Sequence, residues 1–195
     1  TLERFQRTRG VLRMMAAVIY RLWDNRDNSL LIMPCTVPLD WMDVRSEITR
    51  YLPEGWGAVI DKDVDGPQSQ PVKLDRENPN LGRYSACRRV ARTIFFGSAP
   101  SASSKKIHGI EEVRIKLGCV QPGEQPPVFG DALRRLSEQL TYLSSESTRY
   151  WFDIRPTIKK IASDRAAQYE HKPEIVEDEI TTRMKSSVRN DRGDF

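Results

Sequence analysis

The stretch VFGDALRRLSEQLTYLSSESTRYWFDI, residues 128–154, contains two different hydrophobic periodicities. In its first half, apolar side chains recur every three or four residues, which is typical of a helix with one apolar face; they are Phe129, Leu133, Leu136 and Leu140. In its second half, aromatic and β-branched residues lie on both sides of the polar segment 144–148. This pattern predicts a helix over residues 128–140 followed by a β-hairpin.

Two further helices are predicted before this stretch. The first runs over residues 81–96, with Asn80 as its N-cap and Gly97 at its end. The second is a short helix over residues 109–119. The resulting order of helix, helix, turn, helix and hairpin over residues 81–155 is that of a winged-helix domain. In that fold the third helix is the one that enters the major groove of DNA, and the hairpin turn follows the phosphate backbone.

The winged-helix interpretation makes six side chains candidates for contact with nucleic acid. They are Arg134, Arg135 and Gln139 on the third helix, Arg149 after the hairpin turn, and Lys105 and Lys106 before the second helix. The net charge of +4 is also uneven: residues 83–165 carry 15 Lys and Arg against 8 Asp and Glu, whereas the flanking segments are slightly acidic. A local positive excess favours double-stranded DNA as a partner.

The same face carries acidic residues, which favour a different function. They are Glu111, Glu112, Asp131, Glu138 and Glu146. Carboxylates at these positions would repel phosphate, so a surface for protein–protein interaction or assembly is the alternative hypothesis. A continuous basic face would support DNA binding, and a mixed face with exposed apolar side chains would support a partner protein.

The first part of the chain predicts a helical subdomain. An amphipathic helix is expected within residues 9–23 and a second one over residues 40–52. Residues 61–80 are rich in Pro, Asp and Asn, which predicts a loop and a domain boundary. We therefore expect a mainly α fold with a small β-hairpin, divided into a helical subdomain (1–78), a winged-helix domain (79–165) and a charged helix or tail (166–195).

The sequence contains no motif of an independent enzyme. The motifs G-x-x-x-x-G-K-[ST], G-x-S-x-G, H-E-x-x-H and C-x-x-C do not occur, and both histidines lie in polar segments. Asp61, Asp63, Asp65 and Gly66 match the start of a calcium-binding loop, but Val72 stands where the closing glutamate is needed. We expect a plain acidic loop there, and no catalytic residue, metal or cofactor in this chain.

Composition limits the class of protein further. Hydrophobic residues make up 38% and charged residues 30% of 195 residues, and the mean hydropathy of −0.57 comes without any apolar run of membrane-spanning length. The three cysteines are widely separated, which indicates reduced thiols and a cytoplasmic location. The chain begins at Thr1, so we expect a segment of a larger protein.

Several separated phrases resemble one family. FQRTRGVLRMMA, LLIMP, RRVARTIFFGSAP and TYLSSESTRYWFDIRPTIKKIASDRA resemble the C-terminal part of large bacterial AAA+-type ATPases of unassigned function that are associated with phage-defence loci. The resemblance implies an upstream ATPase core that binds ATP and Mg²⁺, with residues 1–78 as its helical lid. It also implies that Arg9, or else Arg13, senses the nucleotide, and that other partners are DNA or defence-system proteins.

Overall fold

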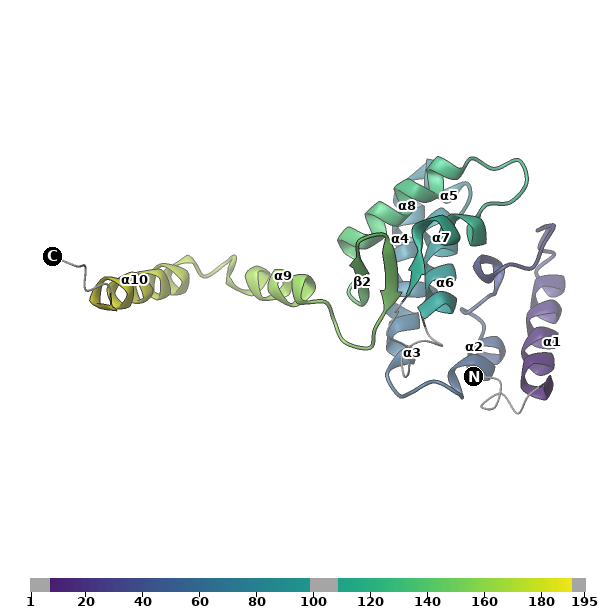
Figure 1. Cartoon of the computed structure of the whole chain (residues 1–195), viewed down its shortest axis with the longest axis horizontal. Helices are drawn as coiled ribbons and strands as arrows, with labels where there is room; N and C mark the ends of the chain where they lie inside the picture. Colours follow the sequence, from purple (N-terminus) through teal and green to yellow (C-terminus); the bar gives the residue numbers. More distant parts are fainter. Residues whose placement is uncertain (1–7, 99–108, 191–195) are drawn as a thin grey trace. The chain divides into compact units, whose positions relative to one another are not determined.

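The computed structural model describes residues 8–98 and 109–190, with side chains from Arg9 to Ser98 and from Gly109 to Val188. Their contacts divide the chain into two units, which meet at the bond between Pro156 and Thr157. Unit 1 contains helices α1 to α8 and a small sheet, and unit 2 contains helices α9 and α10 (Figure 1).

Unit 1 is mainly helical. Its helices are α1 (Thr8–Asp24), α2 (Met42–Thr49), α3 (Trp56–Val59), α4 (Gln70–Glu77), α5 (Pro79–Gly82), α6 (Ala86–Ser98), α7 (Glu112–Cys119) and α8 (Pro126–Gln139), with a 3₁₀ turn η1 (Pro34–Thr36) and a π turn η2 (Ile60–Val64). Helix α6 is the central element and contacts α4, α7, α8, η1 and β3. Its side chains Val90, Ala91, Ile94 and Phe95 are fully buried. A helix that is apolar over so much of its circumference must be surrounded by other elements.

The sheet has three antiparallel strands in the order β1-β3-β2, namely β1 (Ile110–Glu111), β3 (Arg149–Phe152) and β2 (Leu143–Glu146). Leu143 lies opposite Phe152, and both side chains are buried in the core. This confirms the hairpin expected from the sequence. Strand β1 was not expected, because its two residues were assigned to the start of the following helix. It follows Gly109, whose φ of 76° lets the backbone pass close to the Tyr150 carbonyl.

The helix predicted over residues 128–140 is confirmed as α8. Pro126 occupies its first turn, where a missing N–H costs nothing. Phe129, Leu133 and Leu136 are buried along one face, as the spacing requires. The helix over residues 109–119 is confirmed in part as α7, which begins at Glu112 after the strand.

Two expectations before α6 are wrong. The single helix over residues 81–96 is interrupted, because Ser85 has a positive φ of 47° and α6 begins only at Ala86. The first free N–H groups of α6 are capped by Asp75, whose carboxylate accepts from Cys87 N at 3.0 Å and from Arg88 N at 3.1 Å. Asn80 is therefore not the N-cap. The capping carboxylate comes from another helix, α4, so the residues next to α6 in the sequence do not predict it.

The loop expected over residues 61–80 is also wrong. This segment forms most of η2 and all of α4, and its Val64 and Leu74 are buried. One hydrophobic core extends from Val18 to Phe152 and includes residues on both sides of position 78. The contacts divide the chain into its two units after Pro156, and the domain bounds expected at residues 78 and 165 remain predictions.

Unit 2 consists of α9 (Ile158–Tyr169) and α10 (Pro173–Asn190). Thr157 caps α9, since its hydroxyl accepts from the backbone N of Lys160 at 3.3 Å. The sequence predicts a charged helix or tail over residues 166–195, and α10 is a helix in this segment. Their apolar side chains are exposed, for example Ile180 at 52% and Val188 at 75%. In the described residues, no helix is long and apolar enough to cross a membrane.

Candidate functional site

The two arginines expected to contact DNA from α8 are neutralised on their own helix. Arg134, with 62% of its side chain exposed, lies 2.6 Å from Asp131 and 3.8 Å from Glu138. Arg135 Nε donates to the same Asp131 at 3.1 Å. The hydrogen bond from Arg134 is the main reason why the pKa of Asp131 lies below its ordinary value. This face of α8 therefore carries mixed, paired charges and not a continuous basic surface.

The other expected nucleic-acid contacts have structural partners or lie outside the described residues. Gln139 Oε1 accepts from Gln70 Nε2 at 2.8 Å, which joins the end of α8 to α4. Arg149 contacts Glu111 at 2.7 Å and donates to the Gly109 carbonyl at 3.0 Å, so it fastens β3 to β1. Lys105 and Lys106 lie in the segment 99–108, outside the described residues.

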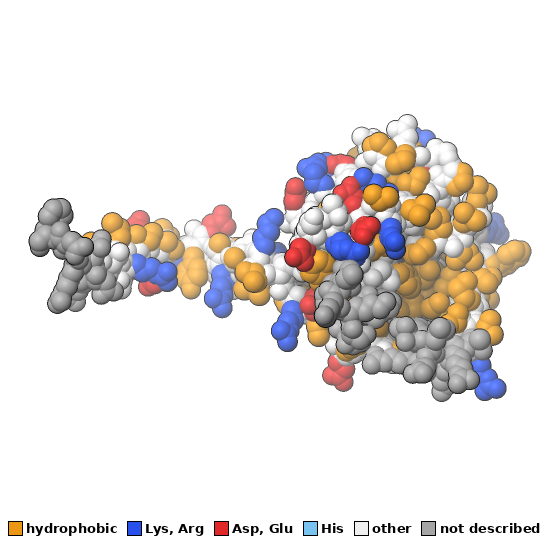
Figure 2. All heavy atoms as spheres, in the orientation of Figure 1, with side chains coloured by type: hydrophobic (Ala, Val, Ile, Leu, Met, Phe, Trp, Pro, Cys, Tyr) orange, Lys and Arg blue, Asp and Glu red, His pale blue; other side chains and the backbone are white. Residues whose placement is uncertain are grey.

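Helix α7 presents an apolar surface beside these charges. Val113 and Leu117, one helical turn apart, are 76% and 75% exposed, while Ile115 and Cys119 face the core. On the same helix, Lys116 is paired with Glu112 at 2.6 Å. We call Val113 and Leu117 the α7 pair. Figure 2 shows hydrophobic side chains gathered over the part of unit 1 where Figure 1 places α7, and further toward α1.

Helix α1 has a second apolar surface, which we call the α1 surface. It consists of Leu12 at 66%, Ile19 at 51%, Tyr20 at 61% and Trp23 at 84% exposure. Three more exposed apolar residues, Leu30, Leu31 and Ile32, follow the helix. The opposite side of α1 packs on α2, where Val18 is fully buried.

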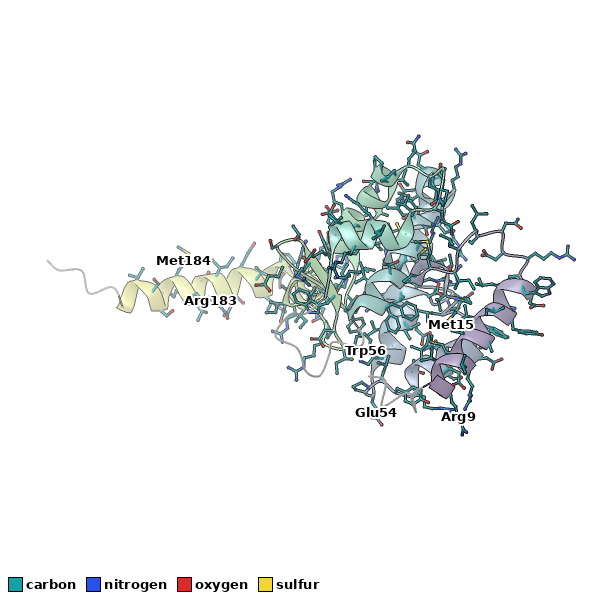
Figure 3. The ribbon with its side chains drawn as sticks, turned by 45° about the vertical axis from the view of Figure 1, so that its right-hand side comes forward. Arg9, Met15, Glu54, Trp56, Arg183 and Met184 are labelled. Atoms are coloured by element: carbon teal, nitrogen blue, oxygen red, sulfur yellow. The ribbon has the colours of Figure 1, made fainter. Side chains whose placement is uncertain are left out.

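The two arginines assigned to nucleotide sensing lie on α1. Arg9 is exposed at the start of the helix, where Figure 3 shows its side chain pointing outward. Arg13 forms an ion pair with Glu47 of α2, which holds it along the α1–α2 contact. The structure thus places the two arginines on one helix, and only the first is without a carboxylate partner among the described residues.

The acidic segment 61–65 is a structural centre that sequence reasoning missed. Asp61 forms an ion pair with Arg45, and Asp63 accepts from the backbone N of Tyr142 at 2.6 Å. Asp65, with no exposed surface, accepts from the backbone N of Asp40 at 2.9 Å and binds two arginines of α6, Arg88 and Arg92. Nowhere in the described ranges do three metal-ligating side chains gather. The carboxylates hold elements together, so the expectation of a plain acidic loop is wrong.

One sequence signal could have pointed to this network. Arg88 and Arg92 are spaced four apart in a helix rich in apolar residues, so their charges need carboxylate partners where that helix is buried. The alternating aspartates 61–65 are the densest run of carboxylates before that helix. The sequence does not show that these two groups meet, because Arg88 follows Asp65 by 23 positions along the chain.

The fold and surface define the chain as a mainly helical domain with a three-stranded antiparallel sheet, two apolar surfaces and paired charges. A family model described as the DUF499 second domain matches residues 1–152. This match covers most of the chain and nearly all of unit 1, so the chain belongs to that family. Neither the curated proteins nor the solved structures include a match to this sequence.

Proposed function

We propose that this domain is a non-catalytic interaction module that binds a partner protein through α7 and the neighbouring face of α8. The observation that carries the proposal is the α7 pair, in which two aliphatic side chains are about three-quarters exposed beside charges that are already paired. Covering exposed aliphatic groups with a partner removes them from water and so favours binding, whereas paired charges form the polar rim of such an interface.

The arrangement of elements supports a winged-helix architecture for this module. Helix α6 is followed by β1, α7, α8 and the hairpin β2–β3, and β1 adds to the outer side of β3. This is the order in which a winged helix is built, with the hairpin as its wing. We therefore propose a winged helix used for protein contact, and we interpret α7 and α8 as its second and third helices.

Site-specific photo-crosslinking in the producing cell tests the proposal. A photoreactive amino acid at position 113 or 117 should form a covalent product with one defined partner, which mass spectrometry identifies. The same amino acid at Ser145, an exposed position on β2, is the matched control and should not give that product. The proposal further requires that Leu117→Asp abolishes the product formed from position 113. An identical product from position 145, or none from α7, would refute it.

DNA binding is the second candidate function, favoured by the same element order and by the +7 charge of residues 83–165. Because its contacts would be mainly with phosphates, binding should weaken steeply with salt. Fluorescence anisotropy with a labelled duplex at low salt provides the test. Loss of binding in the double variant Arg134→Ala, Arg135→Ala would establish this candidate. An affinity for the duplex that is unchanged in this variant would exclude it.

The role of α1 in an ATPase is a further proposal that rests on the family resemblance. There α1 and α2 would form the lid over an upstream core that binds ATP and Mg²⁺, in a cytoplasmic phage-defence protein, and the α1 surface would contact that core. Arg9 is the better placed sensor, because Arg13 is held by Glu47. In the full-length protein, Arg9→Ala should lower ATP hydrolysis more than Arg13→Ala does. Unchanged hydrolysis in both variants would leave the lid proposal without support.

A further inference from the structure

A cavity of about 430 Å³ lies in unit 1, away from the α7 pair. Three stretches of chain line it: the residues that follow α1, the turn between α5 and α6 together with the first turns of α6, and the turn between α7 and α8. Four of its lining side chains are arginines, namely Arg83, Arg88, Arg89 and Arg92. Ligand sites commonly have volumes of roughly 300–1,000 Å³, so the cavity has the size of a small-molecule site.

Carboxylates behind the cavity hold two of these arginines in place. Asp65 binds both Arg88 and Arg92 from the buried side, and Asp40 lies 2.9 Å from Arg88 Nη2. The guanidinium of Arg92 also donates to the Cys35 carbonyl at 3.3 Å. Arginines fixed in this way lose little side-chain entropy when they bind a ligand, which is the usual benefit of preorganisation.

The other two arginines lie on the walls of the cavity. Arg89 contacts Glu124 at 2.7 Å, its Nη2 donates to the Cys119 carbonyl, and its buried Nε has no hydrogen-bond partner among the described residues. Arg83 is exposed, and its Cζ lies over the ring of Tyr84 at 5.3 Å from the ring centroid. The described residues give Arg83 no carboxylate partner. The guanidinium of Arg83 is therefore available to an anion, whereas the buried Nε of Arg89 is not.

The charge balance decides which anion can bind. Four carboxylates in and behind the lining, Asp27, Glu124, Asp65 and Asp40, balance the four arginines in number, but among the described residues none of them forms an ion pair with Arg83. A monoanionic carboxylate ligand would only replace one of the carboxylates already present, so its binding would be weak. A phosphate dianion carries twice the charge and more acceptor oxygens, and it matches the fork of an arginine. The hydroxyl and amide groups of Ser29, Ser85 and Asn28 can complete its hydrogen bonds.

We propose that this cavity binds the phosphate group of a small phosphorylated molecule. The N-terminus of α6 is not part of the site, because Asp75 already accepts from its first N–H groups. The site uses guanidinium groups instead, with Arg83 as the direct donor and with Arg88, Arg89 and Arg92 held by their carboxylate partners beside it. The proposal does not depend on the α7 interface, since the two surfaces share no residue.

Titration of the whole chain, observed by NMR at the arginine Nε–H signals, provides the test. Inorganic phosphate, AMP and glucose 6-phosphate are the probes, and sodium acetate at equal ionic strength is the control. Phosphate should shift the signal of Arg83 with saturation and leave those of Arg134 and Arg183 in place. A tighter site for AMP or for glucose 6-phosphate than for phosphate identifies the organic part of the ligand.

Two substitutions with opposite expected effects distinguish a binding site from a structural cluster. Arg83→Gln, at an exposed position, should weaken phosphate binding about tenfold, as expected for the loss of a charge-assisted hydrogen bond. Glu124→Gln should strengthen it several-fold, because the carboxylate that occupies Arg89 loses its charge while an oxygen remains for the backbone N of Gln121. Arg134→Gln on α8 is the matched control and should change nothing. Absence of saturable shifts in the unmodified chain, or equal shifts with acetate, would overturn the proposal.

Discussion

Asp65 illustrates how one carboxylate can determine the packing of several segments. Its side chain has no exposed surface and is surrounded by Arg88, Arg92 and the backbone N–H of Asp40. Removing a carboxylate and two guanidinium groups from water costs several kcal/mol for each ion, and only close pairing with full hydrogen bonding offsets that cost. The segment after η2 is therefore fixed against α6 by electrostatics within an otherwise apolar core.

Asp65→Asn should destabilise unit 1 by about 3–5 kcal/mol, because it leaves buried guanidinium charge without compensation. The matched control is Asp61→Asn, which breaks the ion pair of an exposed aspartate with Arg45 and should cost about 1 kcal/mol or less. Urea unfolding followed by circular dichroism measures both. Equal losses in the two variants would show that Asp65 is not the centre of the network.

The three cysteines should be unreactive in the folded protein. All three are buried, and burial is the first cause of the raised pKa of Cys35 and of Cys119, the latter raised to about 12. Since the thiolate is the reactive form, a thiol whose pKa lies above the working pH reacts slowly.

Labelling with a thiol reagent at pH 8 should therefore be slow in buffer and should reach all three cysteines in guanidinium chloride. A single added cysteine, Ser145→Cys on the exposed side of β2, is the positive control and should label at once. Fast labelling of any native cysteine in the unmodified chain would mean that the core opens locally.

At the scale of elements, glycine sets how closely α6 approaches the sheet. A Cβ on Gly97 would lie 2.7 Å from the Cβ of Ile110 in β1, too close for any real contact. Gly130 is also helical, in α8, but a Cβ there would meet only the end of the Lys116 side chain at 3.5 Å. Close packing against β1 therefore requires a glycine at position 97, whereas position 130 has room for a larger side chain.

Gly97→Ala should destabilise unit 1 by about 1–3 kcal/mol, because the added methyl group forces α6 away from β1. Gly130→Ala should instead stabilise it by about 0.5–1 kcal/mol, since alanine has the higher helix propensity and the site has room. Thermal unfolding of both variants measures the difference. The close approach of α6 to β1 would be disproved by a neutral or stabilising effect at position 97.

The sequence predicts elements whose stabilisation is local and misses those stabilised from a distance. Helix α8 and the hairpin follow from the periodicity of residues 128–154, because their buried side chains recur within each element. Strand β1 has only two residues, and its pairing with Tyr150 and Arg149 depends on a segment about 40 residues away. Helix α4 has few apolar residues, and its burial reflects Asp75 and Leu74 packing near α6.

The candidate site shows the same limit. The residue types on α8 were identified correctly as an exposed charged face, but the ion pairs of Arg134 with Asp131 and Glu138 depend on rotamers that spacing alone leaves open. The arginine cavity requires three separated stretches to converge, so no local pattern indicates it. Four arginines within ten residues, from Arg83 to Arg92, are the one signal in the sequence.

At the scale of the whole molecule, the described residues contain one hydrophobic core, which lies in unit 1, and the apolar side chains of α9 and α10 are outside it. The core ends with Phe152, and no residue of α9 is buried. The family match also ends at residue 152. Packing and family membership therefore agree on the extent of the domain, although they are independent observations.

Removal of residues 157–195 should leave the stability of unit 1 unchanged within about 1 kcal/mol, because the extension adds no side chain to the core. Urea unfolding of the full chain and of residues 1–156 should give the same midpoint when tryptophan fluorescence is followed, since all four tryptophans belong to unit 1. Removal of residues 143–195 is the contrasting control. It deletes Leu143 and Phe152 from the core and should prevent cooperative unfolding. A large fall in midpoint on removing residues 157–195 alone would mean that α9 and α10 contribute to the fold of unit 1.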